Sequence, residues 1–166
     1  MSWTLPSHIL MRYKTKSFIE TGTNGGQGCM LASSCGFEDI RSVEVISELY
    51  ETAKNNTASN PNIKLYFGKS EEQIPLMLED INHQCTFWLD GHSDYNCPVM
   101  RELEAIKNHS IKDHFILIDD VSMFGTPIHE DITVEEMQNF ILTINQDYKF
   151  IIESNSICPT TICYTC

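Results

Sequence analysis

The sequence predicts an α/β fold: a doubly wound, mostly parallel seven-stranded sheet that ends in an antiparallel C-terminal hairpin. Short runs rich in β-branched and aromatic residues alternate with longer amphipathic stretches, which is the pattern of βαβ units. The expected strands are residues 17–20, 40–45, 63–67, 85–89, 115–118, 148–153 and 162–165. No helical segment separates the last two strands, so we expect them to pair antiparallel.

The expected helices occupy residues 25–35, 47–56, 70–81, 98–108 and 133–145. Ser47 is the predicted N-cap of the second helix. Ser70 and Thr133 each begin a capping box, in which a Ser or Thr is followed three residues later by Gln or Glu. Pro98 suits the first turn of a helix, because its backbone carries no N–H to satisfy.

The chain has 166 residues, about the length of one domain. We expect residues 17–166 to form that domain and residues 1–16 to form an N-terminal extension or partial lid. The N-terminus lacks the apolar segment of a secretion signal, and the chain has seven cysteines. We therefore expect a cytoplasmic protein with free thiols. The pair Cys163 and Cys166 offers only two of the four ligands of a structural zinc site.

The formal net charge is -12, from 23 acidic and 11 basic side chains. Such a charge repels phosphate backbones and anionic membranes, which disfavours nucleic acid as a partner. No apolar run approaches the roughly 18 residues of a membrane span, so we expect no membrane partner. A small molecule is the expected partner.

A glycine-rich segment follows the first predicted strand and leads into a helix. It does not match the dinucleotide-binding pattern, because Leu31 stands where the third glycine would be. Gly68-Lys69-Ser70 does not complete a phosphate-binding loop, because Ile63 stands where the first glycine would be. The segment does match the pattern acidic-x-Gly-x-x-x-Gly-x-Gly, through Glu20, Gly22, Gly26 and Gly28.

Polar residues also follow the second and third predicted strands. A carboxylate at Glu44 is placed to accept hydrogen bonds from ribose hydroxyls, as an acid does at this strand in nucleotide-binding folds. Gly68 and Ser70 follow the third strand, where the edge of an adenine would lie. Each of these residues also has a purely structural interpretation, as a strand-end acid or a turn residue.

Three acids follow the fourth and fifth predicted strands: Asp90, Asp119 and Asp120. Neighbouring parallel strands would place them on one rim, where they would repel one another unless a cation neutralised them. Oxygen ligands favour Mg²⁺, Mn²⁺ or Ca²⁺, and a bound metal can hold a substrate hydroxyl and lower its pKa. The alternative is that the two adjacent acids only cap a turn. His92 is a candidate general base, metal ligand or structural residue, and His129 is a weaker candidate.

These motifs together resemble the class I S-adenosylmethionine-dependent methyltransferases with a Rossmann-like fold, and within them the metal-dependent macrocin-type O-methyltransferases. The resemblance rests on Glu20-Thr21-Gly22-Thr23 with Gly26, Glu44 followed by Ser47-Glu48-Leu49-Tyr50, Gly68-Lys69-Ser70, Leu89-Asp90-Gly91-His92 and Ile118-Asp119-Asp120. It implies S-adenosylmethionine as cofactor and Mg²⁺ as a further one, with Asp90, Asp119 and Asp120 as the metal ligands.

The predicted site follows from the loop and the resemblance together. The cofactor-binding residues are Glu20, Gly22, Thr23, Asn24, Gly26, Glu44, Gly68, Ser70 and Asp90, and the catalytic residues are Asp90, His92 and Asp119. The sequence departs from the family pattern at Lys69, where an acid is common. The chain also leaves little room for an acceptor lid, so residues 1–16 or the second subunit of a homodimer would have to complete the pocket.

Three functions remain as hypotheses. The first is metal-assisted methylation of a hydroxyl on a small acceptor. The second is metal-independent methylation with His92 as the base, and the third is a non-catalytic Rossmann-like interaction module. A nicotinamide oxidoreductase is disfavoured because the dinucleotide pattern fails.

Overall fold

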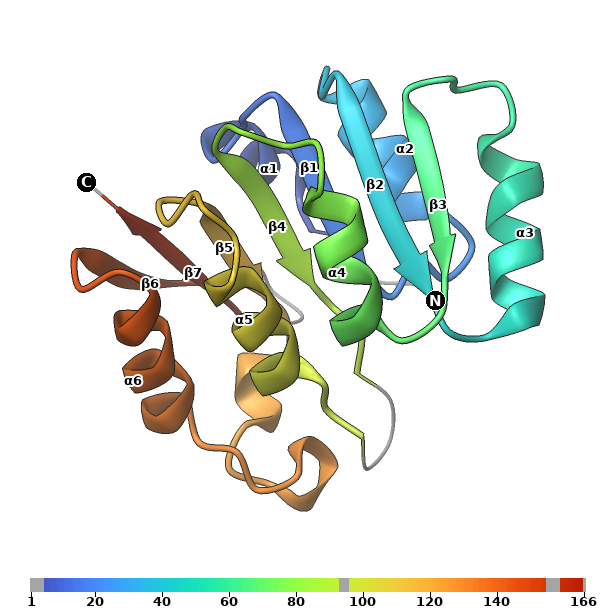
Figure 1. The fold of residues 1–166 in the computed structure, drawn as a ribbon. Coiled ribbons are helices and arrows are strands. Elements are labelled where there is room, and N and C mark those ends of the chain that lie inside the picture. The colour runs from blue at the N-terminus through green and yellow to red at the C-terminus, as the bar shows by residue number, and fades with distance from the viewer. Residues whose placement is uncertain (1–4, 93–95, 155–158, 166) are drawn as a thin grey trace.

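The computed structural model describes residues 5–92, 96–154 and 159–165, in which strands and helices alternate (Figure 1). The strands are β1 (Ser17–Thr21), β2 (Asp39–Glu44), β3 (Ile63–Phe67), β4 (Cys85–Leu89), β5 (Phe115–Ile118), β6 (Tyr148–Ser154) and β7 (Pro159–Thr165). The helices are α1 (Ser7–Arg12), α2 (Gln27–Ser34), α3 (Ser47–Thr57), α4 (Ser70–Leu78), α5 (Val99–Lys107) and α6 (Val134–Ile144), with two 3-10 helices, η1 (Val121–Met123) and η2 (Pro127–His129).

The strands form one sheet in the order β3-β2-β1-β4-β5-β7-β6. Strands β1 to β5 are parallel, while β7 runs antiparallel to both β5 and β6. The prediction of an α/β fold with a mostly parallel sheet is confirmed. The strand order reverses between β1 and β4, which is where open α/β sheets place their ligands.

The register of the central strands determines which of the residues after them lie side by side. Thr21 pairs with Val43 of β2 and with Leu89 of β4, and Leu89 in turn pairs with Ile118 of β5. The carboxyl ends of four neighbouring strands are therefore level with one another. Glu44, Asp90 and Asp119 follow these paired residues and lie along one edge of the sheet.

Helices cover both faces of the sheet. In Figure 1, α4, α5 and α6 lie in front of the sheet, α1 and α2 lie behind it, and α3 lies beside β3. Each face has its own buried apolar cluster. Leu103 and Ile141 belong to the cluster under α4, α5 and α6, and Leu10 and Phe18 belong to the one under α1 and α2. Burial of β4 and β5 on both faces explains why these two strands are apolar runs in the sequence.

The helix ends confirm one predicted cap and correct two others. The capping box at Thr133 is present, with reciprocal hydrogen bonds to Glu136. Ser47 is not an N-cap, because Ile46 holds that position and Glu44 accepts the backbone N–H of Val45 and Ile46. Ser70 does not begin a capping box either. It is already the first residue of α4, so Lys69 is the N-cap, and the helix ends at Leu78 rather than near residue 81.

The N-terminal segment contains a short helix, α1, that the sequence analysis did not predict. Ile9 and Leu10 on this helix are buried. None of the helices in the described part of the chain combines the length and apolar character that crossing a bilayer requires. Cys29, Cys35, Cys85 and Cys97 are free thiols, and the Cys163–Cys166 pair lies outside the described side chains.

Candidate functional site

A cavity of about 410 Å³ lies at the carboxyl ends of the central strands, within the size range of small-molecule sites. The residues predicted to bind the cofactor that line it are Glu20, Gly22, Thr23, Asn24, Glu44, Gly68, Ser70 and Asp90, and His92 lines it as well. Gly26 is the predicted cofactor residue that is not on the cavity wall. The strand register thus brings four separate strand ends to one cavity.

The glycine loop has two positions that only glycine fits. Gly22 has a φ of +79°, and a Cβ there would lie 2.2 Å from the backbone oxygen of Asp90. Gly22 therefore lets the loop after β1 press against the end of β4. Gly26 has a φ of +86°, and its Cβ would lie 2.9 Å from the Thr57 Cγ2 of α3. Gly26 therefore lets the loop approach α3 closely.

Glu20 is a buried acid at the floor of the loop, 5% exposed. The Ser42 hydroxyl donates to its Oε2 at 2.6 Å, and the Cys29 thiol donates to the same oxygen at 3.1 Å. Burial raises the pKa of Glu20 to about 7, against the opposing effect of these two hydrogen bonds. A Cβ at Gly28 would lie 1.7 Å from the Glu20 Oε1, so glycine there makes room for the carboxylate. The Glu20 carboxylate could form an ion pair with a cationic group of a ligand in the cavity.

Glu44 is also 5% exposed and organises the turn around it. Its Oε1 accepts the backbone N–H of Val45 and of Ile46, each at 2.9 Å. Its Oε2 accepts the N–H of Asn24 at 2.8 Å, which ties the glycine loop to the end of β2. Because a carboxylate oxygen accepts about two hydrogen bonds, Oε2 retains capacity for a ligand hydroxyl.

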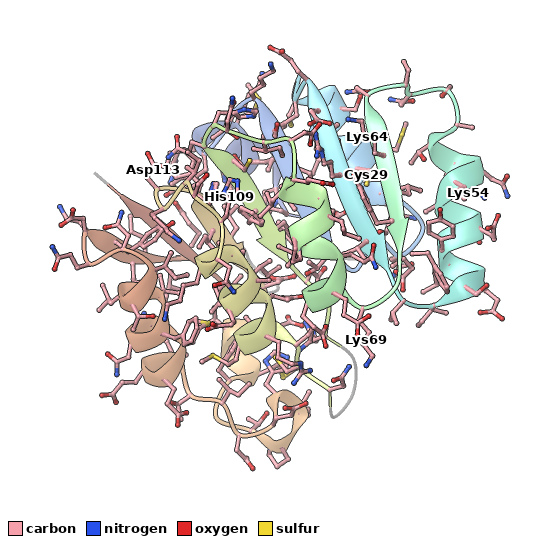
Figure 2. All side chains as sticks on the ribbon, in the orientation of Figure 1. Cys29, Lys54, Lys64, Lys69, His109 and Asp113 are labelled. Carbon is pink, nitrogen blue, oxygen red and sulfur yellow. The ribbon has the colours of Figure 1, made fainter. Side chains whose placement is uncertain are left out.

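The turn after β3 carries Gly68 and Ser70 on the cavity wall, with Lys69 between them. Figure 2 places Lys69 at this turn, ahead of α4, and its ammonium lies 3.8 Å from a carboxylate oxygen of Glu72. The side chain of Lys69 is 64% exposed. The residue that departs from the family pattern is thus directed to solvent rather than into the cavity.

Asp90 and Asp119 stand at the ends of β4 and β5. Burial, and after it the charge of the nearby Asp119 carboxylate, raise the pKa of Asp90 to about 8, although His92 opposes the rise. Asp119 is buried, and its backbone N–H donates to the Leu89 carbonyl at 3.1 Å. The two acids are therefore close enough to repel each other, as predicted for this rim.

His92 lies between two of the predicted acids. Its Nε2 is 2.7 Å from the Asp120 Oδ2, and its Nδ1 is 3.7 Å from the Asp90 Oδ1. Burial lowers the pKa of His92, but the bond to Asp120 and the charges of Asp90, Asp120 and Asp119 raise it above its usual value overall. An imidazole with this raised affinity for a proton suits a group that accepts one at neutral pH.

His129 joins His92 from the 3-10 helix η2. The two ring centroids are 4.6 Å apart, and the His129 ring also packs edge-on against Phe124 at 4.8 Å. His129 is 1% exposed, and neither of its ring nitrogens has a hydrogen-bond partner. Burial, and then the neighbouring His92, lower its pKa. His129 was expected to be a weaker candidate than His92, because the two residues belong to different loops and the sequence does not show that these loops meet.

The structure groups the predicted metal ligands differently from the expected arrangement. Among the described residues, the set whose ligand atoms come within 4.8 Å of one another is His92, Asp120 and His129. Asp90 and Asp119 do not join Asp120 in such a set. The Mg²⁺ site expected at Asp90, Asp119 and Asp120 therefore stays a prediction.

The opposite wall of the cavity is apolar. Its residues are Leu5, Leu10, Phe18, Leu31 and Trp88. Leu5 and Leu10 belong to the N-terminal segment, which the sequence analysis described only as an extension or partial lid. Their part in the wall was missed because this segment carries no motif, only scattered apolar residues.

Several solved structures with a similar architecture are named as O-methyltransferases. An O-methyltransferase, TomG from Streptomyces achromogenes, in complex with SAM, aligns with 96% of this chain and 78% of its own, at a TM-score of 0.70 and 14% identity. A putative caffeoyl-CoA O-methyltransferase from Staphylococcus aureus aligns with 95% of this chain and 80% of its own, at a TM-score of 0.69 and 13% identity.

A third similar structure is an O-methyltransferase from Bacillus cereus in complex with SAH, with a TM-score of 0.67 and 13% identity. The alignment covers 96% of this chain and 78% of the Bacillus cereus protein. At such low identities the likeness establishes the fold. No family model matches the sequence, and no curated protein matches it.

Proposed function

We propose that the chain is an S-adenosylmethionine-dependent methyltransferase that methylates a hydroxyl group of a small acceptor. The observation that carries this proposal is the pair of buried carboxylates, Glu20 and Glu44, in one cavity beside the glycine loop. S-adenosylmethionine presents an ammonium group and ribose hydroxyls, which need such acceptors. The complexes of similar folds with SAM and with SAH support the choice of cofactor.

Each part of the cofactor has a proposed partner in the cavity. The Glu20 carboxylate would hold the ammonium group, whose positive charge would favour the ionised acid. The Glu44 Oε2 would accept a hydrogen bond from a ribose hydroxyl. The adenine would lie beside Gly68 and Ser70, with Asp90 at the end of the cavity that adjoins His92.

Transfer requires that the acceptor oxygen lose its proton as it attacks the methyl carbon. The new bond is oxygen–carbon, the bond that breaks is carbon–sulfur, and the sulfur leaves as a neutral thioether. His92 is the proposed base, because its ring lines the cavity and Asp120 holds its Nε2 at 2.7 Å. Asp120 would stabilise the imidazolium that forms, as an acid does beside a catalytic histidine.

Assistance by Mg²⁺ through Asp90, Asp119 and Asp120 stays a prediction. The 2.7 Å contact between the Asp120 Oδ2 and the His92 Nε2 supports His92 as the base. The apolar wall with Leu5 and Leu10 supports the N-terminal segment as a partial lid over an acceptor with an apolar body. A phenol or a similar small hydroxylated compound fits these requirements.

The test is transfer of a labelled methyl group from S-adenosylmethionine to a panel of small hydroxylated compounds, with and without EDTA. We expect label on an acceptor oxygen, and we expect His92→Ala to lose at least about 100-fold in rate, as general bases typically contribute, while still binding the cofactor. The exposed His8 gives a matched control, His8→Ala. A His92→Ala protein that transfers at the rate of the parent would rule out the base.

A further inference from the structure

We propose that His92, Asp120 and His129 form a binding site for a divalent transition-metal ion such as Zn²⁺. The loop after β4 supplies His92, and the segment after β5 supplies the other two residues. One ligand atom from each residue lies within 4.8 Å of the other two. Tetrahedral Zn²⁺ with bonds of about 2.0–2.1 Å holds its ligand atoms roughly 3.3 Å apart, so small side-chain movements would complete the site.

The buried His129 ring is the independent observation that points to a ligand. Both of its nitrogens are inaccessible and lack a hydrogen-bond partner. A buried polar group without a partner destabilises the fold, so a bound ligand that supplies the partner would stabilise it. A metal ion on the His92 side of the ring would bond one of these nitrogens directly.

The types of ligand select the kind of metal. Imidazole nitrogens suit Zn²⁺, Fe²⁺ and related ions, whereas Mg²⁺ prefers sites made only of oxygen. Two histidines and one carboxylate also leave at least one coordination position open, as in catalytic metal sites. This set shares only Asp120 with the Mg²⁺ site expected at Asp90, Asp119 and Asp120, and its two histidines favour a different metal.

The local backbone holds the three residues in place. Asp120 has a left-handed φ of 53°, which turns the chain after β5. The loop then closes on itself, since the Gly125 N–H donates to the Ile132 carbonyl at 2.7 Å. Phe124 packs on the His129 ring and limits its rotation.

The site borders the proposed cofactor cavity through a shared residue. His92 lines the large cavity, and it also lines a small adjoining hollow together with Asp119 and His129. An ion bound to the Nε2 of His92 would take the place of the proton that this nitrogen shares with Asp120. The metal-bound and metal-free forms would therefore differ in how His92 serves the reaction.

The test is isothermal titration calorimetry, in which Zn²⁺ is added to the metal-depleted full chain without cofactor or acceptor. We expect one ion per chain, and Co²⁺ in its place should give a visible spectrum typical of mixed nitrogen and oxygen ligands. His129→Ala should weaken Zn²⁺ binding by at least about tenfold, because one of three ligands is lost. Asp120→Asn should also weaken it, and asparagine tolerates the left-handed backbone.

Three controls make the result decisive. His8→Ala removes an exposed histidine and should leave Zn²⁺ binding unchanged, and Mg²⁺ should not compete. Cys166→Ser tests whether the C-terminal thiols bind the ion instead. Undiminished binding in both His129→Ala and Asp120→Asn, or no Zn²⁺ binding by the parent protein, would overturn the proposal. Because the measurement needs neither cofactor nor turnover, its outcome is independent of the proposed methyl transfer.

Discussion

Glu102 shows how a single buried acid shapes the stability of this protein. It lies on α5, is 1% exposed, and its Oε1 has no hydrogen-bond partner. Burial raises its pKa to about 7, although the hydroxyls of Ser70 and Thr21 oppose the rise. The folded state therefore binds the Glu102 proton more tightly than the unfolded chain does.

This difference predicts a loss of stability as the pH rises. The contribution of Glu102 is full below the ordinary carboxyl pKa of 4.5 and is lost as the pH passes through about 7. Glu102→Gln removes the titrating group, so its melting temperature should fall less than that of the parent between pH 5 and pH 8. The exposed Glu104 on the same helix supplies the control, Glu104→Gln, which should keep the parent's slope. Equal slopes for Glu102→Gln and the parent would contradict the account.

The residue scale also shows what sequence reasoning can find in the site. Glu20 was predicted because it begins the glycine-loop pattern, and Glu44 because it ends the second strand, where nucleotide-binding folds place an acid. The cavity does contain both side chains. The grouping of Asp120 with His92 and His129 was not predicted, because it depends on how the loop after β5 folds back. No periodic pattern encodes such a loop path.

Secondary-structure elements were predictable where their signals are local. The bounds of β3, β4 and β5 agree with the expected ranges, because each strand is a short apolar run between polar turns. The helix α1 was missed, since it has only six residues and no capping signal. Burial of Ile9 and Leu10 against the rest of the protein stabilises it. Such a tertiary contact cannot be recognised from the local sequence.

Two of the three expected N-caps, Thr133 and Ser47, give a matched test at this scale. Thr133 accepts the Glu136 N–H at 3.1 Å, so Thr133→Ala should lower the free energy of unfolding by about 1 kcal/mol. Ser47 lies inside the first turn of α3 and makes no cap bond, so Ser47→Ala should change it by less than about 0.5 kcal/mol. Denaturant unfolding of both variants measures this, and equal losses would contradict the assignment of the caps.

At the scale of the whole molecule, the strand order determines where the chemistry lies. The alternation of elements predicted a mostly parallel sheet. Such a sheet places the residues at the carboxyl ends of its parallel strands along one edge. The location of the site was therefore predictable, while its apolar wall was not. That wall depends on how α1 packs beside the cavity, and Leu5 and Leu10 reach it only in the folded chain.

The central claim is that the cavity binds S-adenosylmethionine, and isothermal titration of the folded chain with this compound tests it most directly. We predict saturable one-to-one binding that weakens by about 10–100-fold in Glu44→Gln, because a hydrogen bond to a charged acceptor is worth about 1.5–3 kcal/mol. The exposed Glu48 on the adjacent helix provides the control, Glu48→Gln, which should bind as the parent does. Absence of binding by a folded parent protein, or equal affinity in Glu44→Gln, would contradict the account.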